Sequence, residues 1–180
     1  MRTYTLNELL FFTDNGMERL AMLPAMRALG LPDDAVFALR SADATRDRNV
    51  VYLYWDYGGA YGADLERYID SVIAGQPAEG QPGAQYSLGQ LAWIHAIGLV
   101  RDDMARDMQA LGVPTELAAE LAASAAVHKT VLGIWKKHSQ QHGAVMERYF
   151  DACLDSYTPG WPHKRAPAET SVDDAERPAP

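Results

Sequence analysis

The chain has 180 residues, of which 48% are apolar and 22% charged, and its formal net charge is −8. These values are near globular averages, so wholesale disorder is not expected and the length suits one domain with a real core. The apolar runs are short and broken by charged or His residues, which argues against a membrane span. A single cysteine, Cys153, excludes an intramolecular disulfide framework, and no leader-like apolar stretch follows the N-terminus, so we expect a cytoplasmic protein.

The acidic excess runs along the whole chain. Residues 1–82 carry 7 basic and 12 acidic groups, and residues 83–157 carry 6 and 8. Nucleic acid and anionic membranes bind to concentrated basic patches, and the sequence has none. We therefore expect no nucleic-acid partner and no membrane partner.

The strongest pattern in the sequence is an internal repeat. Residues 4–34 align with residues 86–116 without a gap, and 11 of these 31 positions are identical. Farther along, GADLERYID at 62–70 matches GAVMERYFD at 143–151, and Val51 and Trp55 match Val131 and Trp135. The predicted fold is all-α: an internally duplicated helical bundle whose copies pack about a pseudo-twofold axis. The predicted division is a first repeat at 1–74, a linker at 75–85, a second repeat at 86–157 and a Pro-rich tail at 158–180.

About three helices are predicted in each repeat, and the first ends at a shared Ala-Leu-Gly. Gly30 and Gly112 can take the left-handed conformation that ends a helix, and the prolines that follow block its continuation. In the first repeat, Asn15-Gly16 and Pro24 are expected to break or kink this helix.

The second predicted helix is short and the third is long. Asp33 or Thr115 is expected to cap the second helix through a side-chain oxygen. Val50–Trp55, in the third, is β-branched and aromatic like a strand. Its match, Thr130–Trp135, has apolar residues at helical spacing, so both segments are predicted to be helical.

The sequence Glu-Arg-Tyr occurs in both long helices. The tyrosines are expected to enter the core. Arg67 and Arg148 are each expected to pair on the surface with the aspartate three residues later, Asp70 or Asp151.

Tyr-Thr-Leu-Asn-Glu-Leu at 4–9 and Tyr-Ser-Leu-Gly-Gln-Leu at 86–91 resemble the opening of winged helix-turn-helix regulators of the MerR type. That family continues with a turn and a basic recognition helix, and neither follows in this sequence. The acidic charge also argues against DNA binding.

The tail has a different composition from the repeats. Residues 158–180 contain five prolines and few apolar groups, so this segment is expected to be disordered in isolation. It is the part of the chain that we expect to contact a protein partner.

All five histidines lie in the second repeat or beyond it. Along its long helix, apolar, aromatic and His residues recur at steps of three and four: His128, Val131, Trp135, His138, His142, Val145 and Tyr149. His95 lies on the apolar stripe of the first helix of this repeat. We expect these four imidazoles (95, 128, 138 and 142) to point into one bundle, where His138 and His142, one turn apart, can address a transition metal. A buried His could equally ligate haem iron.

Two tyrosines of the first repeat, Tyr57 and Tyr61, match His138 and His142. With the copies packed about a twofold axis, these pairs are predicted to face each other. The expected result is a pocket for a planar or aromatic ligand, lined by Tyr57, Tyr61, Trp135, His138, His142 and Tyr149. The alternative is that these side chains sit at the edge of the core with a purely structural role.

Two functional hypotheses follow. The first is a non-catalytic binding or accessory protein whose His, Tyr and Trp seam holds a small ligand or docks on a larger partner. The second is a metal- or haem-dependent enzyme, or its small subunit, that uses the His cluster. No dense metal-binding motif occurs in the sequence, which favours the first.

Overall fold

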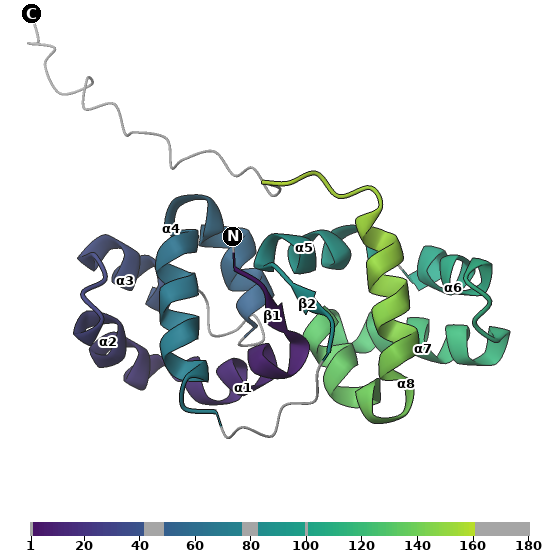
Figure 1. Ribbon diagram of the computed structural model, residues 1–180, viewed down its shortest axis with the longest axis horizontal. Coiled ribbons are helices and arrows are strands. Elements are labelled where there is room, and N and C mark those ends of the chain that lie inside the picture. Colours follow the sequence, from purple (N-terminus) through teal and green to yellow (C-terminus); the bar gives the residue numbers. More distant parts are fainter. Residues whose placement is uncertain (1, 42–48, 77–82, 100, 161–180) are drawn as a thin grey trace, which may run out of the picture.

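The computed structural model describes residues 2–41, 49–76, 83–99 and 101–160. This part of the chain is mostly helical, with eight α-helices, one π-helical turn and one two-stranded sheet (Figure 1). The predicted all-α class is therefore confirmed. No helix among these residues has both the length and the apolar composition needed to cross a membrane. The predicted tail from residue 161 on, and residues 77–82 of the predicted linker, lie outside the described residues.

Both halves of the chain contain a strand and four α-helices in the same order. The first half consists of β1 (Tyr4–Thr5), α1 (Leu6–Gly16), α2 (Arg19–Ala28), α3 (Asp33–Ser41) and α4 (Val50–Ile73). The second half consists of β2 (Gln85–Tyr86), α5 (Leu88–Trp93), the π-helical turn η1 (Ile94–Gly98), α6 (Arg101–Ala110), α7 (Thr115–His128) and α8 (Val131–Leu154).

The first predicted helix of each half is two helices, so each half has four rather than three. In the first half the break follows Gly16, near the predicted Asn15-Gly16. Pro24, also predicted to disturb this helix, lies inside α2 without ending it.

The ends of α2 and α6 are confirmed as predicted. Gly30 and Gly112 have positive φ values of 69° and 80°. After each glycine the chain turns back on the helix: Leu31 N donates to Met26 O at 3.2 Å, and Val113 N makes the equivalent bond at 3.0 Å. This is the hydrogen-bond pattern of a left-handed C-terminal cap.

The starts of α3 and α7 differ from the prediction. Asp33 and Thr115 are the first residues of these helices rather than their caps. The reason is that each helix starts one residue earlier than predicted. The carbonyls of Pro32 and Pro114 accept the first helical hydrogen bonds, each at 2.9 Å.

The two short strands join the halves. β1 and β2 pair antiparallel, with Tyr4 opposite Tyr86 and Thr5 opposite Gln85. Gln85 belongs to the end of the predicted linker, and strands of two residues are too short for a periodic pattern to predict. Buried side chains of both halves form one continuous hydrophobic core.

The two tyrosines of this sheet hold the long helices. The Tyr4 hydroxyl donates to Asp70 Oδ1 at 3.1 Å, and the Tyr86 hydroxyl donates to Asp151 Oδ1 at 3.0 Å. The predicted pair of Arg67 with Asp70 is wrong, because Asp70 faces Tyr4 and Arg2 while Arg67 pairs with Asp64 at 3.1 Å. The carboxylate of Asp151 is likewise directed at the sheet.

The long helices pack across the halves. α1 contacts α4 of its own half and α8 of the other, and α4 contacts α5 (Figure 1). Val50–Trp55 is the start of α4, so the prediction that this strand-like segment is helical is confirmed. Both long helices are kinked, α4 at Tyr61 (φ −126°, ψ 21°) and α8 at His142 (φ −130°, ψ 16°). A glycine follows each kinked residue, which is a usual setting for a kink.

Candidate functional site

Two residues of the predicted ligand seam are structural side chains. Trp135 is 7% exposed and its Nε1 donates to Asn7 Oδ1 at 2.8 Å, which ties α8 to α1. Tyr149 is 2% exposed and its hydroxyl donates to the Gly98 carbonyl at 2.5 Å, which ties α8 to η1. Burial raises the pKa of Tyr149, so its hydroxyl stays protonated. With their polar atoms bonded inside the fold, neither side chain is set up to receive a ligand.

His138 and His142 lie together on α8, with ring centroids 6.4 Å apart. His138 Nε2 lies in a hydrogen bond, at 2.7 Å, with Ser124 Oγ on α7, and its Nδ1 is 3.9 Å from Glu120 Oε1. Burial lowers the pKa of His138, and the nearby Glu120 carboxylate partly opposes this effect. The imidazole of His138 is therefore held against α7.

Of the two tyrosines at the matching positions, Tyr61 contacts α3. The Tyr61 hydroxyl donates to Asp34 Oδ2 over 3.5 Å, and Tyr57 is half-buried against the core. The prediction that Tyr57 and Tyr61 face His138 and His142 is wrong. The reason is that α4 packs mainly on α1, α3 and α5, and α8 mainly on α7, η1 and α1, so Tyr61 contacts α3 and His138 contacts α7.

His95 lies at another place in the fold. Its ring, on η1, packs in T-shaped arrangements with the rings of Tyr52 and Trp55 on α4. The ring centroids are 4.9 Å and 6.1 Å apart, respectively. Its Nδ1 is buried and has no hydrogen-bond partner among the described residues. Burial lowers the pKa of His95. The predicted convergence of four imidazoles is therefore wrong, because the His95 side of η1 faces α4 rather than the His pair of α8.

The described residues contain no group of three or more His, Cys, Asp or Glu side chains that could hold a metal ion. His138, His142 and Glu120 do not make such a group, since both ring nitrogens of His138 already face protein oxygens. Cys153 is no substitute ligand or nucleophile, because burial raises the pKa of its thiol to about 11.

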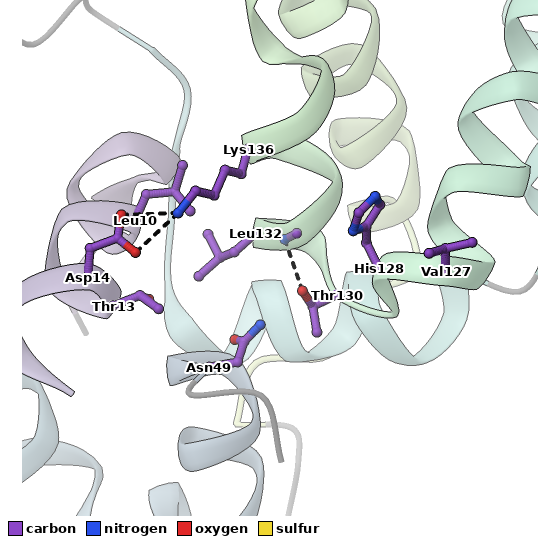
Figure 2. Close-up of a pocket in the computed structure, with 10 residues that line it drawn as sticks. Leu10, Thr13, Asp14, Asn49, Val127, His128, Thr130, Leu132 and Lys136 are labelled. Carbon is purple, nitrogen blue, oxygen red and sulfur yellow. Dashed lines mark hydrogen bonds and ion pairs between the residues drawn. The ribbon is translucent and has the colours of Figure 1, made fainter. Parts of the chain in front are cut away.

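A cavity of about 300 Å³ opens where the two halves meet (Figure 2). We call it the inter-half pocket. Its lining comes from α1, from the residue before α4, from the end of α7 and from the start of α8: Leu10, Thr13, Asp14, Asn49, Val127, His128, Thr130, Leu132, Gly133 and Lys136. Of the predicted site residues, only His128 lies here.

The polar lining of the inter-half pocket is partly buried. Asn49 is 6% exposed and Thr130 is 3% exposed, and among the described residues only Ser87 is another buried polar side chain. Asn49 Oδ1 accepts from Val51 N at 2.8 Å and caps α4, and Thr130 Oγ1 accepts from Gly133 N at 2.9 Å and caps α8. The pocket thus lies at the N-terminal ends of both long helices.

An ion pair crosses one side of the inter-half pocket. Lys136 Nζ lies 3.2 Å from each carboxylate oxygen of Asp14, so α8 of one half is linked to α1 of the other (Figure 2). The two side chains are 62% and 57% exposed. Sequence patterns do not single out these two residues, because their proximity depends on how the halves pack.

A second cavity, of about 430 Å³, lies between α2 and α3 of the first half. Its walls are apolar, from Leu23, Val36 and Phe37, with Arg27, Asp33, Asp34 and Arg40 around them. Phe37 is 71% exposed.

No protein-family model matches this chain, and comparisons with curated proteins and with solved structures found no match either.

Proposed function

We propose that this protein is a non-catalytic binding protein that holds a small molecule in the inter-half pocket. The observation that carries the proposal is the lining, in which the Lys136–Asp14 pair and the Thr13 hydroxyl lie among apolar side chains. Small-ligand sites typically combine apolar walls with a few placed polar groups, and a cavity of about 300 Å³ is at the small end of their range.

The hydroxyl groups of the pocket support binding rather than catalysis. Thr13 Oγ1 donates to the Leu9 carbonyl at 2.7 Å, and Thr130 Oγ1 accepts from Gly133 N. Neither has a base at hydrogen-bond distance among the described contacts, as an activated nucleophile would need. The pocket therefore has groups that can position a ligand but no pair arranged to attack it.

We also propose that the two halves are copies of one unit related by a pseudo-twofold axis. The pairing of Tyr4 with Tyr86, which occupy matched positions in the repeat, supports this, because an axis of this kind places matched residues opposite each other. The matched kinks at Tyr61 and His142 support it as well. In this arrangement the inter-half pocket is formed by one junction between the copies, α1 with α8.

Three further expectations from the sequence are kept as proposals, each with the observation that supports it. Docking on a protein partner through residues 158–180 rests on composition, and a cytoplasmic location rests on the single cysteine. A metal- or haem-dependent enzyme has the paired imidazoles of His138 and His142 as its support. The contacts of His138 with Ser124 and Glu120 favour a structural role for that pair.

The test is a fragment screen on isotope-labelled protein, read by amide chemical shifts. Binding compounds are expected to shift the amides of His128, Leu132 and Gly133, and to leave Val36, at the α2–α3 cavity, unchanged. The control is a Val127→Trp variant, in which the pocket is obstructed. Val127 lines the pocket yet is 73% exposed, so a larger side chain narrows the pocket without disturbing the core. A folded protein whose pocket amides respond to no compound would show the proposal to be wrong.

A further inference from the structure

We infer that the inter-half pocket binds a small zwitterion, a molecule with one carboxylate and one ammonium group on a short apolar body. The carboxylate meets Lys136 and the start of α8, and the ammonium meets Asp14 and the end of α1. This inference rests on the proposed binding function and names the class of ligand.

The positive side of the pocket is formed by α8. Thr130 caps this 24-residue helix, whose first turn contains no acidic residue, so nothing on the helix offsets the positive end of its dipole. Lys136, one turn farther along, adds a full positive charge on the same side. Thr130 and Asn49 also lie in this wall, but their oxygens are occupied in capping α8 and α4, so Lys136 and the start of α8 are the groups left for a ligand. Together these groups suit a carboxylate.

The negative side of the pocket is formed by α1. Asp14 lies in the last turn of this helix, which contains no basic residue. The carboxylate therefore adds to the negative end of the helix dipole instead of offsetting it. A ligand ammonium placed here would be attracted both by the Asp14 carboxylate and by the negative end of the α1 dipole.

Beside the Lys136–Asp14 pair, two leucines bring apolar surface to the pocket. Leu132 is drawn between the Lys136–Asp14 pair and the side where Val127 and His128 lie, and Leu10 lies beside the pair (Figure 2). A body of a few carbon atoms fits such walls, whereas a long or highly polar body does not. The free α-amino acids with aliphatic side chains have this combination of groups.

The ion pair across the pocket is suited to being opened by such a ligand. Lys136 and Asp14 are both more than half exposed, and exposed pairs are weak and screened by salt. A zwitterion gives each of the two side chains a new partner of opposite charge, so neither is left unpaired. A ligand with one charge would leave one of them without its partner.

The charge pair is not a requirement of the fold. In the repeat, Asp14 aligns with Ala96, and Lys136, six residues after the cap Thr130, corresponds to Trp55, six residues after the cap Asn49. The corresponding α4–α5 junction therefore forms without a Lys–Asp pair at these positions. This difference is expected when the pair serves the pocket rather than the scaffold.

The test is calorimetric titration of the full chain with L-valine, L-leucine and L-isoleucine, each compared with two singly charged relatives. For valine these are isobutylamine and 3-methylbutanoate. At least one amino acid is expected to bind, and its amine and its acid to bind at least about tenfold more weakly. Lys136→Gln and Asp14→Asn should each weaken the amino acid by a similar factor. Lys137→Gln, the same charge change one residue outside the pocket, should leave affinity unchanged.

Two outcomes overturn the inference. In the first, 3-methylbutanoate binds as well as valine and Asp14→Asn has no effect, which makes the pocket an anion site. In the second, no amino acid binds while neutral fragments still shift the amides of His128 and Gly133. Either outcome leaves the proposed binding function in place. If no compound shifts the amides of the pocket, both the zwitterion inference and the proposed binding function are wrong.

Discussion

The two junctions between the halves are formed by corresponding helices, α1 with α8 and α5 with α4, yet they are filled differently. At the α1–α8 junction, Thr13 and Gly133 line an open pocket of about 300 Å³. At the α5–α4 junction the aligned positions hold His95 and Tyr52, whose rings pack edge to face at 4.9 Å. Larger side chains at the same positions of the repeat thus occupy the space that smaller ones leave open.

The outer helix pairs differ in the opposite sense. Leu23, Val36 and Phe37 line the cavity between α2 and α3, whereas the aligned residues of α6 and α7 are the alanines at positions 105, 118 and 119. Small side chains let helices approach closely, and α6 and α7 pack directly against each other. Aligned positions with the same residue in both halves stabilise the common fold, whereas aligned positions with side chains of different size determine where cavities form.

The largest expected effect comes from the shared core positions on the junction helices. Leu9 of α1 and Leu91 of α5 align, and both are 0% exposed. Leu9→Ala and Leu91→Ala should each lower the free energy of unfolding by about 3 kcal/mol, because each leaves a cavity in a packed core. Urea unfolding by circular dichroism should give one transition for both variants, since the core is continuous. Two separated transitions would mean that the halves unfold independently.

A smaller effect is expected from opening the filled junction. Tyr52→Leu replaces the aromatic ring at the α4–α5 junction with a smaller apolar side chain. It removes ring contacts with His95 and the hydrogen bond from the Tyr52 hydroxyl to the Lys129 carbonyl at 3.2 Å. We expect a loss of about 2 kcal/mol in urea unfolding. Leu132→Val, a smaller change at a residue that lines the open junction, should cost no more than about 1 kcal/mol. A larger loss from Leu132→Val than from Tyr52→Leu would contradict the comparison.

The matched tyrosines of the long helices should show equal and still smaller effects. Tyr68 donates to the Gly16 carbonyl at 2.6 Å, and Tyr149 makes the same bond to Gly98 at 2.5 Å. Tyr68→Phe and Tyr149→Phe keep the ring and remove the hydroxyl, so each should cost about 1 kcal/mol. A large difference between the two variants would show that η1 and α1 are not held in the same way.

Much of the fold follows from the sequence because the repeat provides two versions of each pattern. Val50–Trp55 resembles a strand by composition, and only its match at 130–135 predicts a helix. Gly30 and Gly112 predict the ends of α2 and α6 for a local reason, the left-handed conformation. Such local rules do not predict the two-residue strands or the π-helical turn, because the formation of these elements depends on packing between the halves.

The candidate site was less predictable because it depends on which helix faces meet. Helical spacing predicts that His138 and His142 lie together, and they do. The same spacing does not show that His95 faces α4 or that Tyr61 faces α3. Asp14 and Lys136 are 122 residues apart in the chain, so no local pattern brings them into one pocket.

The filled junction should also make stability depend on pH through His95. Burial lowers the pKa of His95 in the folded protein, whereas in the unfolded chain it keeps its ordinary value. Between these two pKa values the unfolded chain binds a proton that the folded protein does not. The free energy of unfolding therefore falls as the pH drops below about 6.5, and the decline from this group ends below its folded pKa.

His95→Phe keeps a ring against Tyr52 and Trp55 and removes the titration, so its unfolding free energy should fall less between pH 7.5 and pH 5.5 than that of the unaltered protein. Urea titrations at both pH values measure this difference. His138 titrates in the same direction, because burial lowers its pKa too, so His138→Gln is the comparison variant. Its Glu120 carboxylate opposes the shift, whereas the buried Nδ1 of His95 has no partner among the described residues. His95→Phe should therefore flatten the profile more than His138→Gln, and an unchanged slope in His95→Phe would contradict the role of the filled junction.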